Sequence, residues 1–152
     1  MIGSRRKHDW NSWENYLLVH ETTLNKYINT RHVAGPRQYT RNKLTDQNIQ
    51  LSIEGLILKS DLGVEIQIKI EKTVELDIEY SRPRARTFSY SYHALTPKPN
   101  ARNLMRYCSP HEHRPHHHKH LYYSDGTYNV LDVPDRTWPH VSEFLDEVLC
   151  QY

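Results

Sequence analysis

The sequence lacks several features that mark well-known classes of protein. No run of apolar residues approaches the roughly 18–20 residues that a membrane-spanning helix needs. The basic start of the chain is not followed by an apolar stretch, so it does not resemble a secretory signal. A glycine-rich phosphate loop, a nucleophile elbow and a Cys-x-x-Cys pair are also missing, which disfavours nucleotide hydrolases, esterases and zinc ribbons. We therefore expect a cytoplasmic protein that makes no contact with a membrane.

Cysteine is scarce, and the length sets a second limit. The two cysteines, Cys108 and Cys150, are too few and too scattered to form a disulfide framework, so we expect both to be reduced. At 152 residues the chain is long enough for one ordinary domain and too short for two independent ones. We therefore expect a single domain over residues 1–152.

Histidine, tyrosine and segregated charge are abundant by contrast. Eleven histidines and eleven tyrosines stand against two phenylalanines, a composition that suits a polar binding face. The net charge of +2 divides into blocks of +5, −5, +7 and −5 over residues 1–45, 46–81, 82–120 and 121–152. If residues 82–120 form one surface, that surface attracts phosphates. The alternative is that blocks of opposite charge pair within the fold and leave no basic patch.

Apolar residues recur at helical spacing near both ends of the chain. One amphipathic helix is predicted between Trp13 and Ile28, with His20 on its apolar stripe, inside a helical lead-in of residues 1–45. A second is predicted between Trp138 and Leu149, inside a C-terminal helical segment of residues 137–152.

Between the helices the apolar period changes to two, as in β-strands. Residues 49–53 and 64–71 alternate on either side of a turn at 60–63, which predicts a hairpin with one buried face. Further strands are predicted at 74–80, 88–92, 104–107 and 119–123, with Phe88, Tyr90 and Tyr92 on one face of the second of these. The result is an α+β fold, in which an antiparallel sheet of about five or six strands within residues 46–123 is flanked by the N-terminal and C-terminal helices. The apolar sets predicted to bury one another are Ile66, Ile68 and Ile70 in the sheet, and Val141, Leu145 and Val148 in the helix.

Three short motifs follow one another in the C-terminal two thirds of the chain. They are Tyr90-Ser91-Tyr92-His93, Arg106-Tyr107-Cys108 and His117-His118-Lys119-His120, and they lie between the turn Asp61-Leu62-Gly63 and the segment Val141-Ser142-Glu143-Phe144-Leu145. In this order and at these intervals they resemble the TumE-like toxin family. Members of that family typically show a Tyr-Ser-Tyr-His strand, an Arg-Tyr-Asp strand, a His-rich loop ending in His-His-Lys-His, and a final helix. Cys108 stands where the family has an acidic residue, so no role of that carboxylate carries over to this chain.

The resemblance implies a prokaryotic toxin that inhibits growth when free. It also implies a partner, the cognate antitoxin encoded by an adjacent gene, which holds the toxin harmless. By analogy with other small basic toxins, the target is expected to be RNA or the ribosome, with inhibition of translation as the result.

The basic, His-rich block contains side chains suited to cleaving RNA without a metal. His118 and His120 share a face if their segment is a strand, and we expect them to transfer protons beside His93, because histidine titrates near neutrality. Arg106 is expected to stabilise the charge of the phosphate. The residues expected to contact RNA are Lys119, Arg114, Arg102, Tyr107, Tyr92 and His117, the tyrosines by stacking on bases.

These residues predict a metal-independent endoribonuclease with no cofactor, and a homodimer is compatible with them. We also expect an acidic or helical segment of the antitoxin to cover Arg102, Arg106 and Arg114, because complementary charge speeds association.

Other interpretations of the same residues remain open. The His-x-His pairs at 111/113, 116/118 and 118/120 have a geometry that can bind a divalent metal, although no Cys or carboxylate stands at a recognisable ligand spacing. The tract can also be a solvated loop, and the alternating tyrosines can be ordinary strand packing. At the level of function, the alternative is a non-catalytic module that binds nucleic acid or a protein partner through the same basic face.

Overall fold

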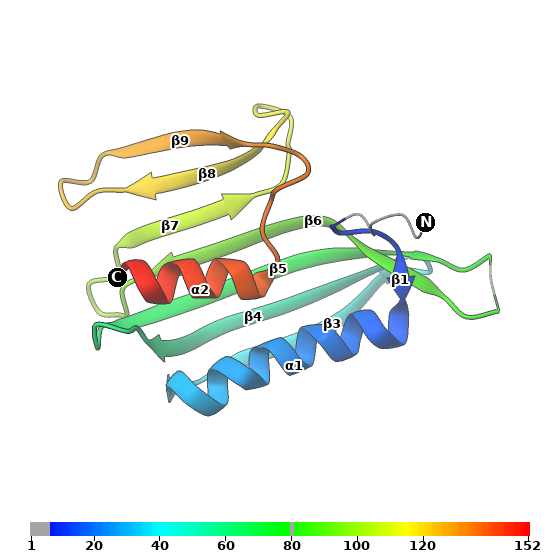
Figure 1. Cartoon of the computed structure of the whole chain (residues 1–152), viewed down its shortest axis with the longest axis horizontal. Helices are drawn as coiled ribbons and strands as arrows, with labels where there is room; N and C mark the ends of the chain where they lie inside the picture. Colours follow the sequence, from blue (N-terminus) through cyan, green and yellow to red (C-terminus); the bar gives the residue numbers. More distant parts are fainter. Residues whose placement is uncertain (1–6, 80) are drawn as a thin grey trace, which may run out of the picture.

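The fold is an antiparallel sheet with two helices on one of its faces (Figure 1). The structure is a computed structural model, which describes residues 7–79 and 81–152. The helices are α1 (Trp13–Arg31) and α2 (Val141–Gln151). The strands are β1 (Asn11–Ser12), β2 (His32–Ala34), β3 (Gln38–Thr45), β4 (Asn48–Lys59), β5 (Glu65–Asp77), β6 (Arg84–Leu95), β7 (Asn103–Cys108), β8 (His117–Tyr122) and β9 (Tyr128–Val133).

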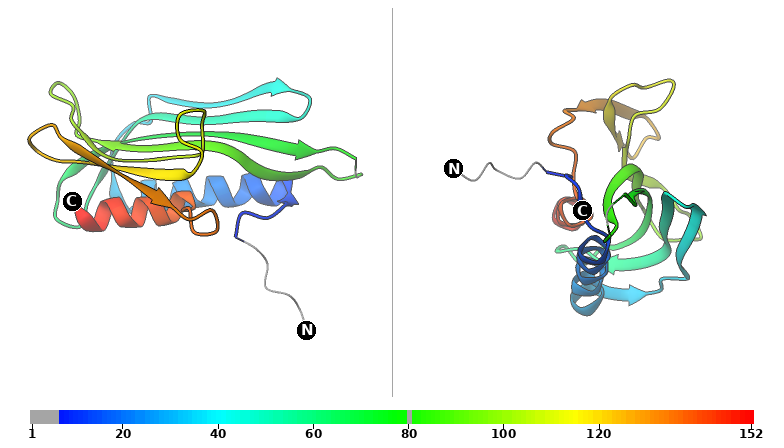
Figure 2. Two further views of the ribbon diagram at one scale, coloured as in Figure 1. Left: turned by 90° about the horizontal axis from the view of Figure 1, so that it is seen from above. Right: turned by 90° about the vertical axis from the view of Figure 1, so that its right-hand side faces the viewer.

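Neighbours along the chain are neighbours in most of the sheet. The strand order is β2-β4-β5-β6-β7-β8-β9, with β3 also paired to β4 and β1 to β6, and every pairing is antiparallel. Figure 2 shows both helices on the same face of the sheet, while the opposite face carries no helix. We call these the helix face and the open face. Neither helix within the described ranges is long and apolar enough to cross a membrane.

The core lies between the helix face and α2, as the apolar periods predict. Ile66, Ile68 and Ile70 alternate along β5 and are completely buried. Against them pack Val141, Leu145 and Val148, which recur on one side of α2 and are also buried. Full burial of one such side chain is worth about 1.5–3 kcal/mol, so these contacts dominate the attachment of the helix. The α+β class and this predicted pairing are therefore confirmed.

The start of α1 is fixed by a side chain that the sequence supplies. Ser12 is the N-cap, and its Oγ accepts a hydrogen bond from the backbone N–H of Asn15 at 3.1 Å. The helix then buries His20, Leu24 and Tyr27 against the sheet. Both ends of the chain therefore supply helices to the same face.

The sheet is larger than the predicted five or six strands. It has nine strands within the described residues, because four segments without a regular apolar alternation, β1, β2, β3 and β9, also pair. The predicted helical lead-in of residues 1–45 is wrong beyond α1, since β2 and the largely exposed β3 follow it. Strand β9 lies beyond residue 123, where the sheet was expected to end. The runs 64–71 and 74–80 were expected to be separate, but one strand, β5, takes in most of both; Tyr80 lies outside the described residues.

A bulge in β6 corrects a further prediction. Thr73 of β5 pairs with Ser89 and Val74 pairs with Thr87, so Phe88 has no partner of its own. Phe88 is 67% exposed, whereas Tyr90 and Tyr92 are buried on the helix face. The three aromatic residues therefore do not share a face, because the extra residue reverses the alternation.

One position of the buried row in β5 carries a charge. Lys72 follows Ile70 at the spacing of two and is only 7% exposed, with Leu51 and Tyr90 opposite it on the neighbouring strands. Its Nζ lies 4.8 Å from the ring centroid of Tyr16 on α1. No carboxylate pairs with it among the described residues. Burial lowers the pKa of Lys72 from 10.5 to about 7, because the charged amine has lost its water.

We expect Lys72 to make stability depend on pH. Between about pH 7 and pH 9.5 the unfolded chain holds the Lys72 proton and the folded protein releases it, so stability rises with pH, by at most about 1.4 kcal/mol per unit. Lys72→Met should remove this contribution, whereas Lys59→Met, at an exposed position of β4, should keep it. Urea denaturation at a series of pH values measures the difference. Equal pH slopes for the wild type and Lys72→Met would contradict the burial of this amine.

Candidate functional site

A row of basic side chains crosses the open face of the sheet. Lys69 of β5 pairs with His93 of β6, His93 with Arg106 of β7, and Arg106 with His120 of β8. Residues that pair directly across antiparallel strands point to the same face, so four consecutive strands each contribute one basic residue. We call Lys69, His93, Arg106 and His120 the basic row. Nζ of Lys69 lies 3.6 Å from Oε1 of Glu71. No ion pair joins Arg106, His93 or His120 to a carboxylate of the described residues.

Beside the basic row lies a group of histidines, His111, His118 and His120, which we call the histidine cluster. The His118 ring is 1% exposed, and its Nδ1 donates to the carbonyl oxygen of His116 at 3.0 Å. Its Nε2 lies 3.3 Å from Nε2 of His111, which is on the exposed loop after β7. The ring centroids of His118 and His120 are 5.2 Å apart. As predicted, His118 and His120 therefore share a face.

The electrostatics of this cluster favour the neutral forms of His111 and His120. Burial lowers the pKa of His120, and the neighbouring His118, Arg106 and Arg114 lower it further because they are or can become cationic. Burial and neighbouring cations also lower the pKa of His111. The Nε of Arg106 and the Nδ1 of His120 are buried and have no hydrogen-bond partner. This side of the sheet can therefore accept an anion or a proton without first losing an existing ion pair.

Cys108 joins the same cluster, which sequence spacing did not reveal. It pairs directly with His118 across β7 and β8, and Sγ of Cys108 and one ring nitrogen each of His118 and His120 lie within 4.8 Å of one another. Sulfur and imidazole nitrogen are the ligands that Zn²⁺ prefers in proteins. Burial raises the pKa of the Cys108 thiol, although Arg106 acts in the opposite direction. The group can hold a metal ion. No local sequence pattern indicates it, because Cys108 and His118 are ten residues apart and meet only through the register of β7 with β8.

Lys119 and Tyr107, which were expected to contact RNA, point to the helix face instead. Nζ of Lys119 lies 2.7 Å from a carboxylate oxygen of Glu147 on α2. The hydroxyl of Tyr107 donates to the same carboxylate at 2.9 Å, and Lys119 lies over the Tyr107 ring. In this structure both side chains attach α2 to the sheet, so the predicted contacts with phosphate and base would require them to leave Glu147.

Tyr92 and His117 are likewise on the helix face. Tyr92 is 1% exposed and packs on Phe144 of α2, so it has no free ring face for a base. His117 stacks on Trp138 with ring centroids 5.2 Å apart, and its Nδ1 lies 2.9 Å from the hydroxyl of Tyr90. The predicted stacking by Tyr92 is wrong, and His117 is a packing residue in this structure.

The remaining predicted residues lie near the basic row or in loops. His93 is separated from β8 by β7, so it flanks Arg106 rather than His118, and its Nε2 lies 2.7 Å from Oδ1 of Asn103. Arg102 and Arg114 are exposed in loops.

Several charges of the basic blocks do pair with the acidic blocks, as Arg31 does with Asp61. Arg102, Arg106 and Arg114 form no such pair with the described residues, so part of the charge is left over on this side.

Comparison with known proteins gives one match. A family model described as "Toxin TumE" matches residues 41–150, which is more than two thirds of the chain. The matched segment runs from β3 to α2 and contains the whole basic row and histidine cluster. No curated protein and no solved structure matches the chain.

Proposed function

The chain belongs to the TumE toxin family, and from this we propose that it is a toxin that cleaves RNA on the open face of the sheet. It is the toxin of a toxin–antitoxin system, and its family implies a cognate antitoxin as partner. The observation that carries the proposal is the position of Arg106, between His93 and His120 and without a carboxylate partner among the described residues. An unpaired guanidinium flanked by imidazoles suits a phosphodiester, which needs charge stabilisation and proton transfer at one place.

The proposed reaction uses the residues in distinct roles. Arg106 binds the nonbridging phosphate oxygens. His120, half-buried and neutral, takes the proton from the 2′-hydroxyl, whose oxygen then attacks the adjacent phosphorus. The bond from phosphorus to the 5′-oxygen breaks, and that oxygen receives a proton from a second imidazole. The Nδ1 hydrogen of His118 is donated to the carbonyl of His116, and its Nε2 lies 3.3 Å from Nε2 of His111. When the phosphate anion binds, one added proton shared by these two Nε2 atoms makes the His111–His118 pair cationic, and this proton passes to the 5′-oxygen. Products are a 2′,3′-cyclic phosphate and a free 5′-hydroxyl.

The antitoxin is proposed to act by covering the same surface. Arg102 and Arg114 lie in exposed loops at the two ends of the segment that contains β7, and neither forms an ion pair with the described residues. An acidic segment lying across the open face would pair with them and exclude RNA from Arg106.

Replacing residues of the two faces of β7 and β8 separates catalysis from stability. We expect His120→Ala to lower the rate of RNA cleavage by about 10²–10⁴-fold, the usual contribution of a positioned acid or base. Arg106→Gln should lower it roughly 10–100-fold, as expected when a charge-assisted hydrogen bond is lost. Lys119→Met is the matched control, because Lys119 neighbours His120 but pairs with Glu147 on the helix face.

The measurements are cleavage of a labelled RNA by the purified variants and growth of cells that express them. Lys119→Met should lose only stability, by about 1 kcal/mol, and should still cleave and inhibit growth. If His120→Ala and Arg106→Gln fold normally and remain fully toxic, this catalytic site is wrong.

A second candidate function is metal-assisted hydrolysis, which the juxtaposition of Cys108, His118 and His120 favours. In that case the ion activates water, and the histidines are ligands rather than proton carriers. The two candidates make opposite predictions about a chelator, because only the second needs an ion in the cluster.

Titration with Co²⁺ decides between them. If the cluster is a metal site, the protein should develop a thiolate-to-cobalt absorption band that Cys108→Ser abolishes and Cys150→Ser, at an exposed position of α2, preserves. Cleavage of RNA should then stop in excess chelator and return with added metal. Absence of the band, together with full cleavage in chelator, would exclude the metal and leave acid–base catalysis.

A further inference from the structure

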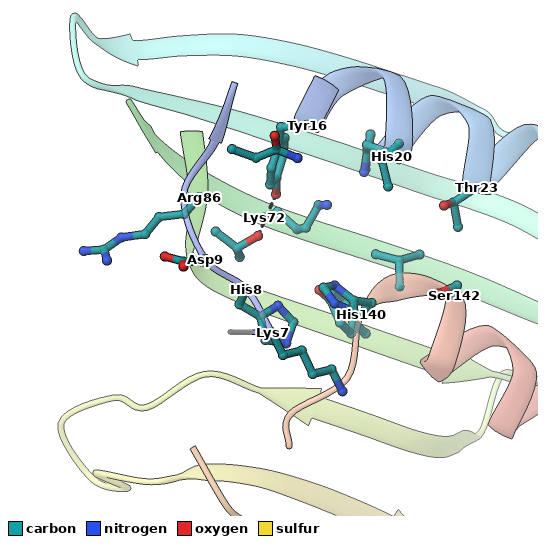
Figure 3. Close-up of a pocket in the computed structure, with 15 residues that line it drawn as sticks. Lys7, His8, Asp9, Tyr16, His20, Thr23, Lys72, Arg86, His140 and Ser142 are labelled. Atoms are coloured by element: carbon teal, nitrogen blue, oxygen red, sulfur yellow. Dashed lines mark hydrogen bonds between the residues drawn. The ribbon is translucent and has the colours of Figure 1, made fainter. Parts of the chain in front are cut away.

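A cavity of about 400 Å³ lies on the helix face, away from the basic row. It is enclosed by α1, the start of α2 and the strands β5 and β6. Figure 3 shows Tyr16, His20 and Lys72 gathered on one side of it, with His8 and His140 on another. The volume falls within the range of small-ligand pockets in proteins, roughly 300–1,000 Å³.

The amine of Lys72 lies in the wall of this cavity, and no carboxylate among the described residues neutralises it. It is nine-tenths buried, and its contact with the Tyr16 ring leaves its N–H donors without an acceptor among the described residues. The Tyr16 hydroxyl is already engaged with Oγ1 of Thr87 at 2.6 Å. A buried cation without a partner is costly, so the amine tends to lose its proton, and an anion bound beside it would stabilise the charged form.

His20 presents a second unsatisfied group to the same cavity. It is 4% exposed, and both of its ring nitrogens are buried with no hydrogen-bond partner among the described residues. Lys72 is close enough to His20 to act on it electrostatically, adding to the effect of burial in lowering the His20 pKa to about 3. Two donors from different elements, β5 and α1, therefore lack an acceptor in the same place.

The other cationic side chains of Lys and Arg that line the cavity already have carboxylate partners. Lys7 pairs with Glu143, and Arg86 pairs with Glu75. Among the described residues the one carboxylate that lines the cavity belongs to Asp9, whose Oδ1 accepts the backbone N–H of Trp10 at 2.9 Å. The first residues of α2, Val141 and Ser142, also line the cavity, and the N-terminus of a helix favours negative charge. No described group of the cavity wall accepts a hydrogen bond from Lys72 or His20, so a bound ligand can supply the acceptor.

We propose that this cavity binds the phosphate group of a small phosphorylated ligand, with Lys72 and His20 as its hydrogen-bond donors. A phosphate has several acceptor oxygens and up to two charges, which suits donors that arrive from separate elements better than a carboxylate does. Tyr16, Val19 and Val141 line the remainder of the cavity and provide apolar surface for an attached group such as a nucleoside. The site is separate from the proposed RNA site, because the two lie on opposite faces of the sheet.

Isothermal titration calorimetry with inorganic phosphate, AMP, adenosine and acetate tests the proposal. It is carried out on the full chain with Arg106→Gln, so that the open face does not contribute a phosphate site. Phosphate and AMP should bind, AMP more tightly, and adenosine and acetate should not.

Adding Lys72→Met should weaken the binding of AMP at least about tenfold, the loss expected for one charge-assisted hydrogen bond. Adding Lys59→Met should leave the affinity unchanged. His20→Phe, which keeps the ring and removes both nitrogens, should also weaken AMP and serves if Lys72→Met fails to fold.

Three results would overturn the proposal: no heat with either phosphate or AMP, equal affinity of AMP for the Lys72→Met protein, or equal binding of acetate. Competition by an RNA oligonucleotide with no binding of free AMP would also overturn it, in favour of an RNA contact. None of these measurements involves cleavage, so their results do not depend on whether the proposed ribonuclease activity is correct.

Discussion

The alternation of side chains along the β-strands is the constraint on which the rest of this structure depends. In β5 it sends Ile66, Ile68 and Ile70 to the helix face and Lys69 to the open face. In β8 it directs Lys119 to the helix face, where Lys119 pairs with Glu147, and it directs His120 to the open face, beside Arg106. Beside α2 the helix face is filled by packing and by the ion pair of Lys119 with Glu147, whereas the open face keeps Arg106, which has no carboxylate partner among the described residues.

Sequence patterns could predict the parts of the fold in which this alternation coincides with hydrophobicity. Strands β4 to β8 and both helices fall in that class. Strand β3 could not be predicted, because its side chains are largely exposed and its pairing with β4 rests on backbone hydrogen bonds. The bulge at Phe88 could not be predicted either. The sequence of β6 alternates regularly through this residue, but the bulge moves Phe88 to the face opposite to Tyr90.

The candidate sites show the same limit. The shared face of His118 and His120 followed from their spacing, but the partner of Lys119 did not, because Glu147 approaches only when α2 packs on the sheet. Cys108 joined the cluster through the register of β7 with β8, which the sequence does not encode locally. The burial of Lys72 was not predicted either, because the strand was expected to end at residue 71, although this lysine continues the period of Ile66, Ile68 and Ile70.

The central claim is that RNA binds the open face, and histidine NMR tests it most directly. Imidazole resonances of the ¹⁵N-labelled protein would be followed during titration with an RNA oligonucleotide whose 2′-hydroxyls are replaced by hydrogen, so that it cannot be cleaved. His93 and His120 should shift, while His20 and His140, which line the cavity on the helix face, should not. Shifts confined to His20 and His140 would contradict the account and place the nucleic acid on the other side of the sheet.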